Sequence, residues 1–308
     1  MRPIIERLLP APRNGGFRME GYFVWCGSLI KADGKYHMFA SRWPKETGFP
    51  DGYRRHSEIV RAVSDTPEGP YTFQEVVLKG RGGDWWDGRM CHNPKIYKTG
   101  EAFVLYYNAT DLSNRLLHGK HPYRQAGYAA ATSVYGPWRR LDQPLPIGED
   151  NNNPAPYFHK DGSVLLIYRD WDLRMHIAKA DSYKGPYKVV ARDFFKEGRL
   201  EDPDLHFDNG LYNMVMEDNQ SKITGHERHG GHLVSEDGIN WRRHEHPCAY
   251  SHDIVFDDGT KIRAERRERP EMFNAKADVK GNGPPTHLAT GVLYKGETWN
   301  LVQPIAAE

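Results

Sequence analysis

Cysteines, long apolar runs and net charge are all scarce in this sequence. The three cysteines, Cys26, Cys91 and Cys248, are odd in number and have no paired spacing, which argues against a disulfide framework and against a zinc knuckle. The 42 Lys and Arg residues nearly balance the 41 Asp and Glu residues, so the basic stripe of a nucleic-acid-binding protein is lacking. No window approaches the length and hydrophobicity of a membrane span. We therefore expect no nucleic-acid or membrane partner, and a neutral or lightly charged ligand.

The N-terminus lacks the features of a secretory leader. Charged residues and prolines interrupt residues 1–10 before any apolar stretch long enough for a signal peptide. This pattern predicts a cytoplasmic protein, or a periplasmic or secreted one if a leader has been removed. Aromatic side chains are plentiful instead, with 8 Trp, 17 Tyr and 12 Phe. Because each buries a large area, a core can form without long aliphatic runs.

An internal repeat is the strongest signal in the chain. Four segments share one pattern: a strand that opens on a small or proline-bearing motif, a glycine turn, and a second strand rich in Tyr, Val, Leu and Phe. Such a pattern is typical of a β-hairpin. The four segments are residues 24–41, 91–108, 153–170 and 201–218.

A second motif follows each hairpin. Gly-Pro pairs ending at Pro70, Pro137 and Pro186 mark equivalent turns, residues 233–241 form a fourth copy, and residues 266–304 suit a fifth unit. Five units, each of about four short antiparallel strands, predict an all-β, five-bladed β-propeller that occupies residues 1–308 as a single domain. A β-sandwich would not repeat this pattern four times, and a solenoid would have more regular insert lengths.

In a propeller, the starts of the innermost strands and the connections between second and third strands meet at one end of the axis. These places carry polar and aromatic residues, although the Asn and Asp side chains could equally cap turns that the prolines rigidify. Trp offers flat apolar faces for sugar rings, and Arg and Asn bind hydroxyl groups. The candidate substrate-binding residues are Trp25, Arg42, Trp43, His56, Arg89, His92, Asn93, Asn153, Arg169, Trp171 and Arg269.

Acidic residues at the same positions suggest acid–base chemistry. Hydrolysis of a glycosidic bond needs one protonated carboxyl group and one ionised carboxylate beside the scissile bond. Glu201 is the first candidate for the acid, because Asp202 beside it should raise its pKa. Asp87 is the first candidate for the base, and Glu268 is a further acidic group at the axis. A carboxyl separation above about 12 Å would exclude the pair of Glu201 and Asp87.

A histidine-rich run needs separate weighing. His226, His229 and His232 are spaced three apart, which allows a metal site, but this spacing in a β loop does not bring three side chains to one point. We therefore expect no metal and no cofactor. Two alternatives remain open for these histidines. His232 hydrogen-bonds the substrate or acts as a general acid, or all three are solvated loop residues.

Four similar motifs stand at the strand starts: HNPKI (92–96), NNPAPYF (152–158), EDPDLHF (201–207) and ERPEM (268–272). They resemble the motifs of glycoside hydrolase families 43 and 117. The resemblance covers residues 20–304, and it implies a five-bladed propeller that hydrolyses glycosidic bonds. In family 43 the base is an Asp in the first innermost strand, an Asp in the third blade tunes the acid, and the acid is a Glu before Pro in the fourth.

Two of these family positions differ in this chain. Glu201, with Pro203 behind it, matches the acid, but the first blade has Cys26 and the third has Asn153 where family 43 has Asp. The resemblance therefore leaves the base to Asp87 or Glu20. Resemblance to family 117 implies a variant of this mechanism in which a histidine is the acid, and this again points to His232.

The expected function is hydrolysis of a plant, algal or bacterial oligosaccharide, with exo action. One alternative is a carbohydrate-binding propeller without catalysis. Another is a glycoside phosphorylase or transferase, for which Arg89, Arg169 or Arg269 would supply the phosphate pocket. The sugar, the linkage, the stereochemical outcome and the oligomeric state are left open by the sequence.

Overall fold

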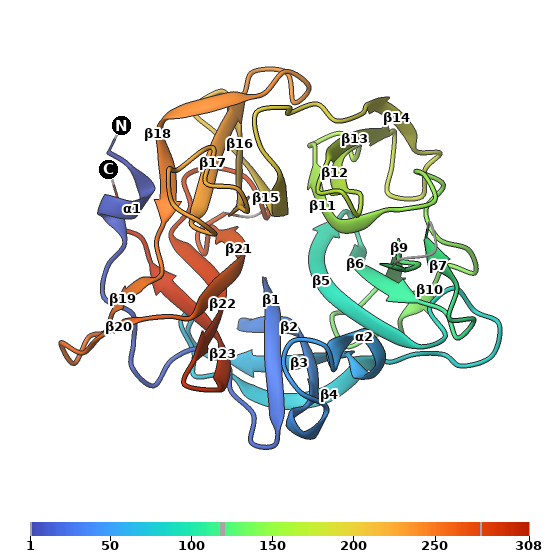
Figure 1. Cartoon of the computed structure of the whole chain (residues 1–308), viewed down its shortest axis with the longest axis horizontal. Coiled ribbons are helices and arrows are strands. Elements are labelled where there is room, and N and C mark those ends of the chain that lie inside the picture. The colour runs from blue at the N-terminus through green and yellow to red at the C-terminus, as the bar shows by residue number, and fades with distance from the viewer. Residues whose placement is uncertain (1, 118–120, 278, 308) are drawn as a thin grey trace.

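The computed structural model describes residues 2–117, 121–277 and 279–307, and its main features are five antiparallel sheets around a common centre (Figure 1). Each sheet is one blade, and its first strand is innermost. This confirms the all-β, five-bladed propeller. The strands are, for blade 1, β1 (Tyr22–Ala32), β2 (Lys35–Pro44), β3 (Glu58–Ser64) and β4 (Thr72–Leu78); for blade 2, β5 (Met90–Thr99), β6 (Ala102–Thr110), β9 (Gln125–Ala131) and β10 (Arg139–Arg140); for blade 3, β11 (Asn152–Phe158), β12 (Val164–Arg169), β13 (Met175–Ala180) and β14 (Lys188–Ala191); for blade 4, β15 (Leu200–Asp208), β16 (Leu211–Asp218), β17 (Gly230–Ser235) and β18 (Arg242–Tyr250); and for blade 5, β21 (Arg266–Phe273), β22 (His287–Tyr294) and β23 (Glu297–Pro304).

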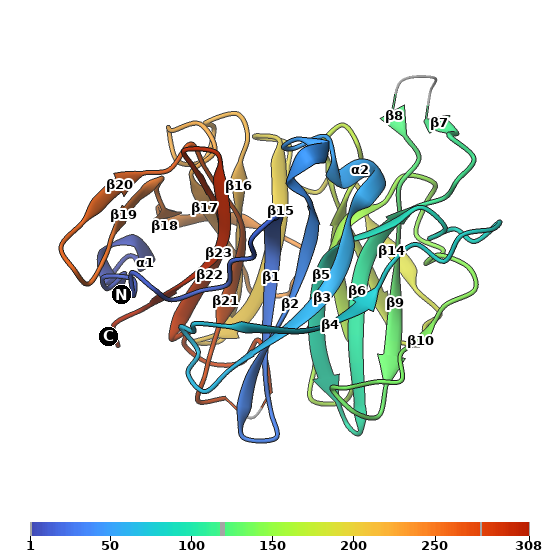
Figure 2. The same cartoon turned by 90° about the horizontal axis from the view of Figure 1, so that it is seen from below.

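The remaining elements are short. Two small hairpins and two helices, α1 and α2, decorate the blades, and Figure 2 shows the hairpin β7–β8 and α2 standing at the same end of the propeller. Each helix has four residues, far below the length of about 20 needed to span a lipid bilayer. These elements are α1 (Ile4–Arg7), a 3-10 turn (Lys45–Thr47), α2 (Tyr53–His56), β7 (Leu116–Leu117), β8 (His121–Pro122), β19 (Asp253–Val255) and β20 (Lys261–Arg263).

The four hairpins expected from the repeat are present as the first two strands of blades 1 to 4. Between the blades, their alternate apolar side chains pack face to face. Phe39, Ile96 and Leu105, for example, are fully buried between blades 1 and 2. The hydrophobic core is therefore a series of sheet-to-sheet layers around the axis, which is what period-two sequence patterns produce when both faces of a sheet are covered.

The N-terminal segment closes the ring. Phe17 and Asn300 exchange two backbone hydrogen bonds of 2.9 and 3.0 Å, and Leu9 N donates to Pro304 O at 2.9 Å. The segment thus pairs with β23, which adds N-terminal backbone to the C-terminal blade. Both ends of the chain lie beside α1 in Figure 1.

Candidate active site at the propeller axis

The same irregularity occurs in all five innermost strands. Each strand contains a β-bulge in its first half, and one non-glycine residue in the bulge has a positive φ between 52° and 60°. A bulge inserts an extra residue that does not pair with the neighbouring strand, and this redirects its side chain. In all five strands the redirected side chain turns toward the axis. The five residues are Cys26, Asn93, Asn153, Asp202 and Arg269.

We call these five residues the axial ring, and hydrogen bonds join four of them, Asn93, Asn153, Asp202 and Arg269. Asn93 Nδ2 donates to Asn153 Oδ1 at 2.7 Å, the Asn153 amide donates to Asp202, and the Arg269 guanidinium binds Asp202 from the other side. The ring residues line a narrow cavity of about 10 Å³, about the space of one water molecule. The axis is therefore not an open channel at this level.

Buried ion pairs close the axis beyond the ring. Lys95 Nζ lies 2.6 Å from Asp204 Oδ1 and 3.4 Å from Glu271 Oε2, and Lys280 Nζ lies 2.9 Å from Glu271 Oε1. Two largely buried lysines thus balance two buried carboxylates. Since such pairs are stable only when every charge is matched, this part of the axis is structural.

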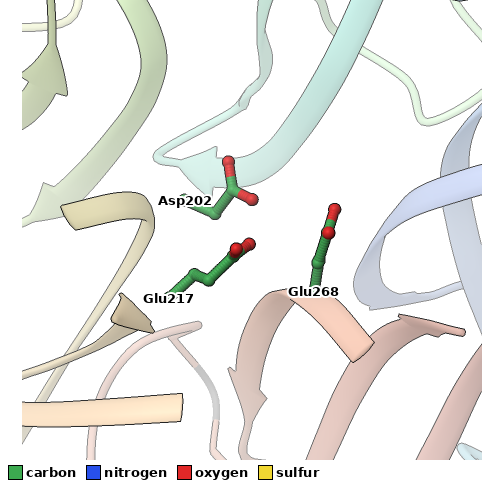
Figure 3. A group of neighbouring side chains, drawn as sticks. All are labelled: Asp202, Glu217 and Glu268. Atoms are coloured by element: carbon green, nitrogen blue, oxygen red, sulfur yellow. The ribbon is translucent and has the colours of Figure 1, made fainter. Parts of the chain in front are cut away.

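On the other side of the ring, four carboxyl groups from blades 4 and 5 gather. Glu201 and Glu217 are partners in the register of β15 and β16, so their side chains share one face of the sheet. Carboxyl oxygens of Asp202, Glu217 and Glu268 all lie within 4.8 Å of one another, and Figure 3 shows the three side chains directed at one point. We refer to these four residues as the carboxyl cluster.

Four arginines surround the carboxyl cluster. Arg228 Nη1 donates to Glu217 Oε1 at 2.8 Å and to Glu268 Oε1 at 3.1 Å, so one guanidinium bridges two carboxyl groups. The other pairs are Arg169 with Glu201, Arg269 with Asp202, and Arg266 with Glu268 at 3.3 Å.

The environment separates the pKa values of these carboxyl groups. Burial raises the pKa of Glu201, but the charges of Arg169 and Arg269 and a hydrogen bond from Asn219 outweigh burial and lower it to about 2. Burial raises the pKa of Asp202 to about 7, with help from the charges of neighbouring carboxylates and against the opposing charge of Arg269. The order is therefore the reverse of the sequence-based expectation, in which Glu201 had the raised pKa.

Glu217 is a second carboxyl group whose surroundings favour the protonated form. Burial, followed by the charges of Glu268, Glu201 and Asp202, raises its pKa well above the usual 4.5, and Arg228 only partly opposes this. Its Oε2, like Oδ2 of Asp202, is buried and has no hydrogen-bond partner in the described part of the chain. At neutral pH the cluster thus holds both protonated and ionised carboxyl groups.

Asp202, Glu217 and Glu268 are also the described residues best arranged to hold a hard metal ion, because each offers an oxygen. Arg228 already supplies a positive charge to two of the three. The predicted absence of a metal remains a prediction.

An aromatic and basic wall rises above the axial ring. Tyr53 in α2 stacks on His92 with ring centroids 4.5 Å apart, and His92 Nε2 lies 3.7 Å from Cys26 Sγ. Burial, with the charges of Arg269 and Arg124, lowers the pKa of His92 well below 6.5, so this imidazole is neutral. The guanidinium of Arg124 lies 4.6 Å from the centroid of the Trp171 ring.

Asp87 does not reach the axis, contrary to the expectation. Its buried carboxylate accepts hydrogen bonds from Arg81 Nε at 2.5 Å, Arg140 Nη1 at 3.2 Å and Tyr107 Oη at 2.8 Å. Arg140 is in β10, the outermost strand of blade 2. The error arose because a long connection precedes β5, and Asp87 turns back under the outer strands before the innermost strand begins.

Other predicted residues also lie away from the carboxyl cluster. His232 on β17 contacts Asn213 at 3.0 Å and stacks on His244 at 4.3 Å, whereas His226 and His229 form a separate contact, so the three spaced histidines do not converge. Arg42 pairs with Glu58 at 2.7 Å in blade 1. His56 is exposed in α2, and Arg89 binds backbone oxygens of residues 111 and 112. Trp25 and Trp43 are buried in an aromatic cluster beside Phe49. Trp43 reaches the site only from behind its wall, with its ring centroid 5.9 Å from those of Tyr53 and His92.

The predicted residues that the fold does bring together are those next to a bulge or at a strand end. They are His92, Asn93, Asn153, Arg169, Trp171, Glu201, Asp202, Glu268 and Arg269. Six contributors were not singled out from the sequence: Tyr53, Arg124, Glu217, Asn219, Arg228 and Arg266. Only Glu217 had a usable signal, because pairing the hairpin 201–218 in antiparallel register places it opposite Glu201.

No known protein family and no curated protein matches this sequence. Solved structures match its fold across nearly the whole chain. A family 117 glycoside hydrolase from the marine bacterium Zobellia galactanivorans is 16% identical, with a TM-score of 0.67 over 96% of this chain and 87% of that chain. A family 43 β-xylosidase/α-arabinofuranosidase from a compost microbial metagenome, solved with xylotriose, is 14% identical, with a TM-score of 0.64 over 100% and 94%.

An endo-arabinase from Bacteroides thetaiotaomicron is 11% identical, with a TM-score of 0.63 over 96% of this chain and 98% of that chain. At these identities the likeness concerns the fold. The expected resemblance to families 43 and 117 is confirmed at that level: this chain has the five-bladed propeller of those hydrolases.

Proposed function

We propose that this propeller is a glycoside hydrolase whose reaction takes place at the carboxyl cluster of blades 4 and 5. The observation that carries the proposal is the gathering of four buried or nearly buried carboxyl groups in one small cluster, with oxygens of three of them within 4.8 Å of one another. Their surroundings move the pKa values apart, to about 2 for Glu201, to about 7 for Asp202 and well above 4.5 for Glu217. Glycosidic hydrolysis needs a proton donor and an ionised carboxylate side by side, and environments that push two pKa values apart create this pair.

Asp202 is our candidate for the general acid. It lines the cavity at the axial ring, its Oδ2 has no hydrogen-bond partner among the described residues, and a pKa near 7 suits proton donation at neutral pH. The close contact with Arg269 fixes the other oxygen, Oδ1, and so orients Oδ2.

Glu201 is our candidate for the ionised carboxylate, which acts either as the base that activates water or as the nucleophile. Its side chain is 17% exposed, more than those of Asp202, Glu217 and Glu268, so it is the member of the cluster most accessible to substrate. Arg169 and Asn219 bind its two oxygens and keep it ionised. This assignment replaces the earlier one, in which Glu201 was the acid.

Glu217 and Glu268 have a supporting role in this proposal. Glu217 is fully buried, so we assign it as a positioning residue rather than a catalytic one. As a protonated neighbour it limits the negative charge next to Asp202, and Arg228 holds it beside Glu268.

We propose an oligosaccharide substrate and exo action. The solved neighbours include an enzyme in complex with xylotriose, which supports an oligosaccharide. The hairpin β7–β8 and α2 raise one side of the rim at the end of the propeller that bears the site (Figure 2), which favours entry of a chain end over passage of a long chain. Product analysis over time tests this: an exo enzyme releases one small product from the first minutes.

The test of the proposed reaction is turnover of aryl glycosides and defined oligosaccharides by the variants Glu201→Gln and Asp202→Asn. We expect each to lower kcat by 10²- to 10⁴-fold, the usual contribution of proton transfer or its ionised partner. Glu245→Gln, an exposed position on β18, is the matched control and should be unchanged. A loss below about tenfold in either variant would remove that residue from its role.

A second candidate function is carbohydrate binding without catalysis. It is favoured by the composition of the axial ring, because Cys26, Asn93 and Asn153 place no carboxylate on the side of blades 1 to 3. Calorimetry that shows sugar binding, together with no turnover of any glycoside, would favour this function.

A further inference from the structure

Arg124 is a buried cation without a matching carboxylate. The residue is 4% exposed, and its Nη2 donates one hydrogen bond, to Tyr53 Oη at 2.7 Å. Its Nε is buried without a hydrogen-bond partner, and within the described ranges no carboxylate lies at ion-pair distance. The nearby Asp150 carboxylate accepts a hydrogen bond from the backbone of Trp171 instead. A buried charge is costly unless it is paired, so this guanidinium needs a partner from outside.

The surroundings of Arg124 add to this excess of positive charge. Burial lowers the pKa of Arg124, and the charges of Arg169 and Arg54 lower it further, although Tyr53 partly opposes them. Arg169 is itself matched by Glu201, whereas among the described residues Arg124 has no ion pair and feels the Asp150 carboxylate only at longer range. A neutral sugar would leave that charge unbalanced.

Arg124 stands in the wall of the candidate active site. It lies between the end of the hairpin β7–β8 and the start of β9, in the connection of blade 2 that reaches the site end of the propeller. Its guanidinium carbon is 5.2 Å from the centroid of the Tyr53 ring and 4.6 Å from that of the Trp171 ring. Tyr53 in turn stacks on His92, which contacts Cys26 of the axial ring.

A separate cavity of about 500 Å³, which we call the arginine-lined groove, lies at the rim of blade 2. Two of its lining residues are chain neighbours of the site wall: Tyr123 precedes Arg124, and Arg54 follows Tyr53. The Arg115 guanidinium stacks over the Tyr123 ring at 4.2 Å, and Arg89 is held by backbone oxygens and by Asn114 rather than by a carboxylate. The charged residues that line this groove are Arg54, Arg55, Arg89, Arg115 and Asp111, so its lining is strongly basic.

We propose that the substrate is an acidic oligosaccharide, with a carboxylate or sulfate group that binds Arg124 while the remaining acidic units lie along the arginine-lined groove. This inference rests on the proposed glycosidase function. The planar guanidinium offers two parallel N–H donors to a carboxylate or sulfate, and the surrounding rings exclude water, so the contact discriminates strongly between acidic and neutral sugars.

The test is calorimetric binding to the full-length protein carrying Glu201→Gln, with three probes of equal length: oligogalacturonides, sulfated galactan oligosaccharides and neutral xylo-oligosaccharides. We expect at least one acidic probe to bind about 10- to 100-fold more tightly than the neutral one, as charge-assisted hydrogen bonds imply. The preference should weaken as salt is added. The better acidic probe identifies the anionic group as carboxylate or sulfate.

Adding Arg124→Gln should remove the preference, so that acidic and neutral probes then bind with similar affinities. Arg242→Gln, at an exposed position on β18, is the matched control. If Arg124→Gln does not fold, the double variant Arg55→Gln/Arg115→Gln, at two exposed groove positions, should weaken binding of long acidic probes and reduce the dependence on salt.

Equal binding of acidic and neutral probes, or a preference that survives Arg124→Gln, would overturn the inference. Measuring both binding and turnover distinguishes failure of this inference from failure of the proposed glycosidase function. Hydrolysis of neutral glycosides without acidic preference would refute only the acidic substrate. Arg124-dependent binding of acidic oligosaccharides without any hydrolysis would refute only the glycosidase.

Discussion

At the scale of single residues, the chemistry depends on how burial and arginine contacts distribute protons. Glu201 and Asp202 are adjacent in the sequence, yet their pKa values move in opposite directions, to about 2 and about 7. The difference arises because two arginines and Asn219 surround one carboxylate, whereas burial dominates at the other. Adjacent acidic residues were recognisable in the sequence, but their protonation was not, since it depends on partners from three other blades or connections.

Glu217→Gln tests the protonated state of the buried carboxyl group. Since its pKa is raised above 4.5, the folded protein keeps this proton at pH values where the unfolded chain has lost it. Its favourable contribution is complete below pH 4.5 and is lost as pH rises toward the raised value. A neutral amide mimics the protonated form, so we expect the variant to become more stable relative to the parent as pH increases from 5 to 8.

Melting temperatures across that pH range measure the effect. Activity provides the second readout, because a positioning residue should alter the pH profile while kcat at its optimum changes by less than about tenfold. A variant that is destabilised equally at every pH would mean that Glu217 is ionised in the folded protein.

At the scale of the strand, the bulge in each innermost strand is what delivers side chains to the axis. A left-handed residue at Cys26, Asn93, Asn153, Asp202 and Arg269 is the feature common to all five. The proline that follows in four blades was visible in the sequence and identified the right place. The left-handed backbone could not be predicted from the sequence, because Cys and Arg rarely adopt this conformation and no local pattern marks it.

Asn93→Ala and Asn93→Gly separate the backbone conformation from the lost side chain. Both remove the hydrogen bond to Asn153, but only alanine must bear the cost of a left-handed backbone at a φ of 60°. We expect the alanine variant to be less stable than the glycine variant by about 1–2 kcal/mol. Urea unfolding measures the difference, and equal stabilities would show that the bulge relaxes in the variants.

At the scale of the whole molecule, the ring is closed by chain segments about 280 residues apart in the sequence. Phe17 is 1% exposed and packs in the apolar layer beside Val24 and Phe273, while its backbone pairs with Asn300. The axis is sealed by the lysine and carboxylate pairs behind the ring. The site thus has a solid base and opens at one end only.

Phe17→Ala tests the closure. Removing a fully buried aromatic ring at this junction should cost about 3–5 kcal/mol of unfolding free energy. Phe73→Ala, at a 37% exposed position on β4, is the matched control and should cost far less. Urea unfolding followed by tryptophan fluorescence compares the two, and similar losses would show that the closure contributes little to stability.

The repeat, the strands and the number of blades could be read from local sequence, because hairpin turns, Gly-Pro turns and alternating apolar residues act over a few positions. The acidic motif of residues 201–203 and the ring residues at 93, 153 and 269 were found in the same way. The sequence did not predict which residues of the long connections reach the site. Asp87 turns outward, while Tyr53 and Arg124 turn inward. Packing between blades decides those directions. The same packing brings in the partners that decide which carboxyl group keeps its proton.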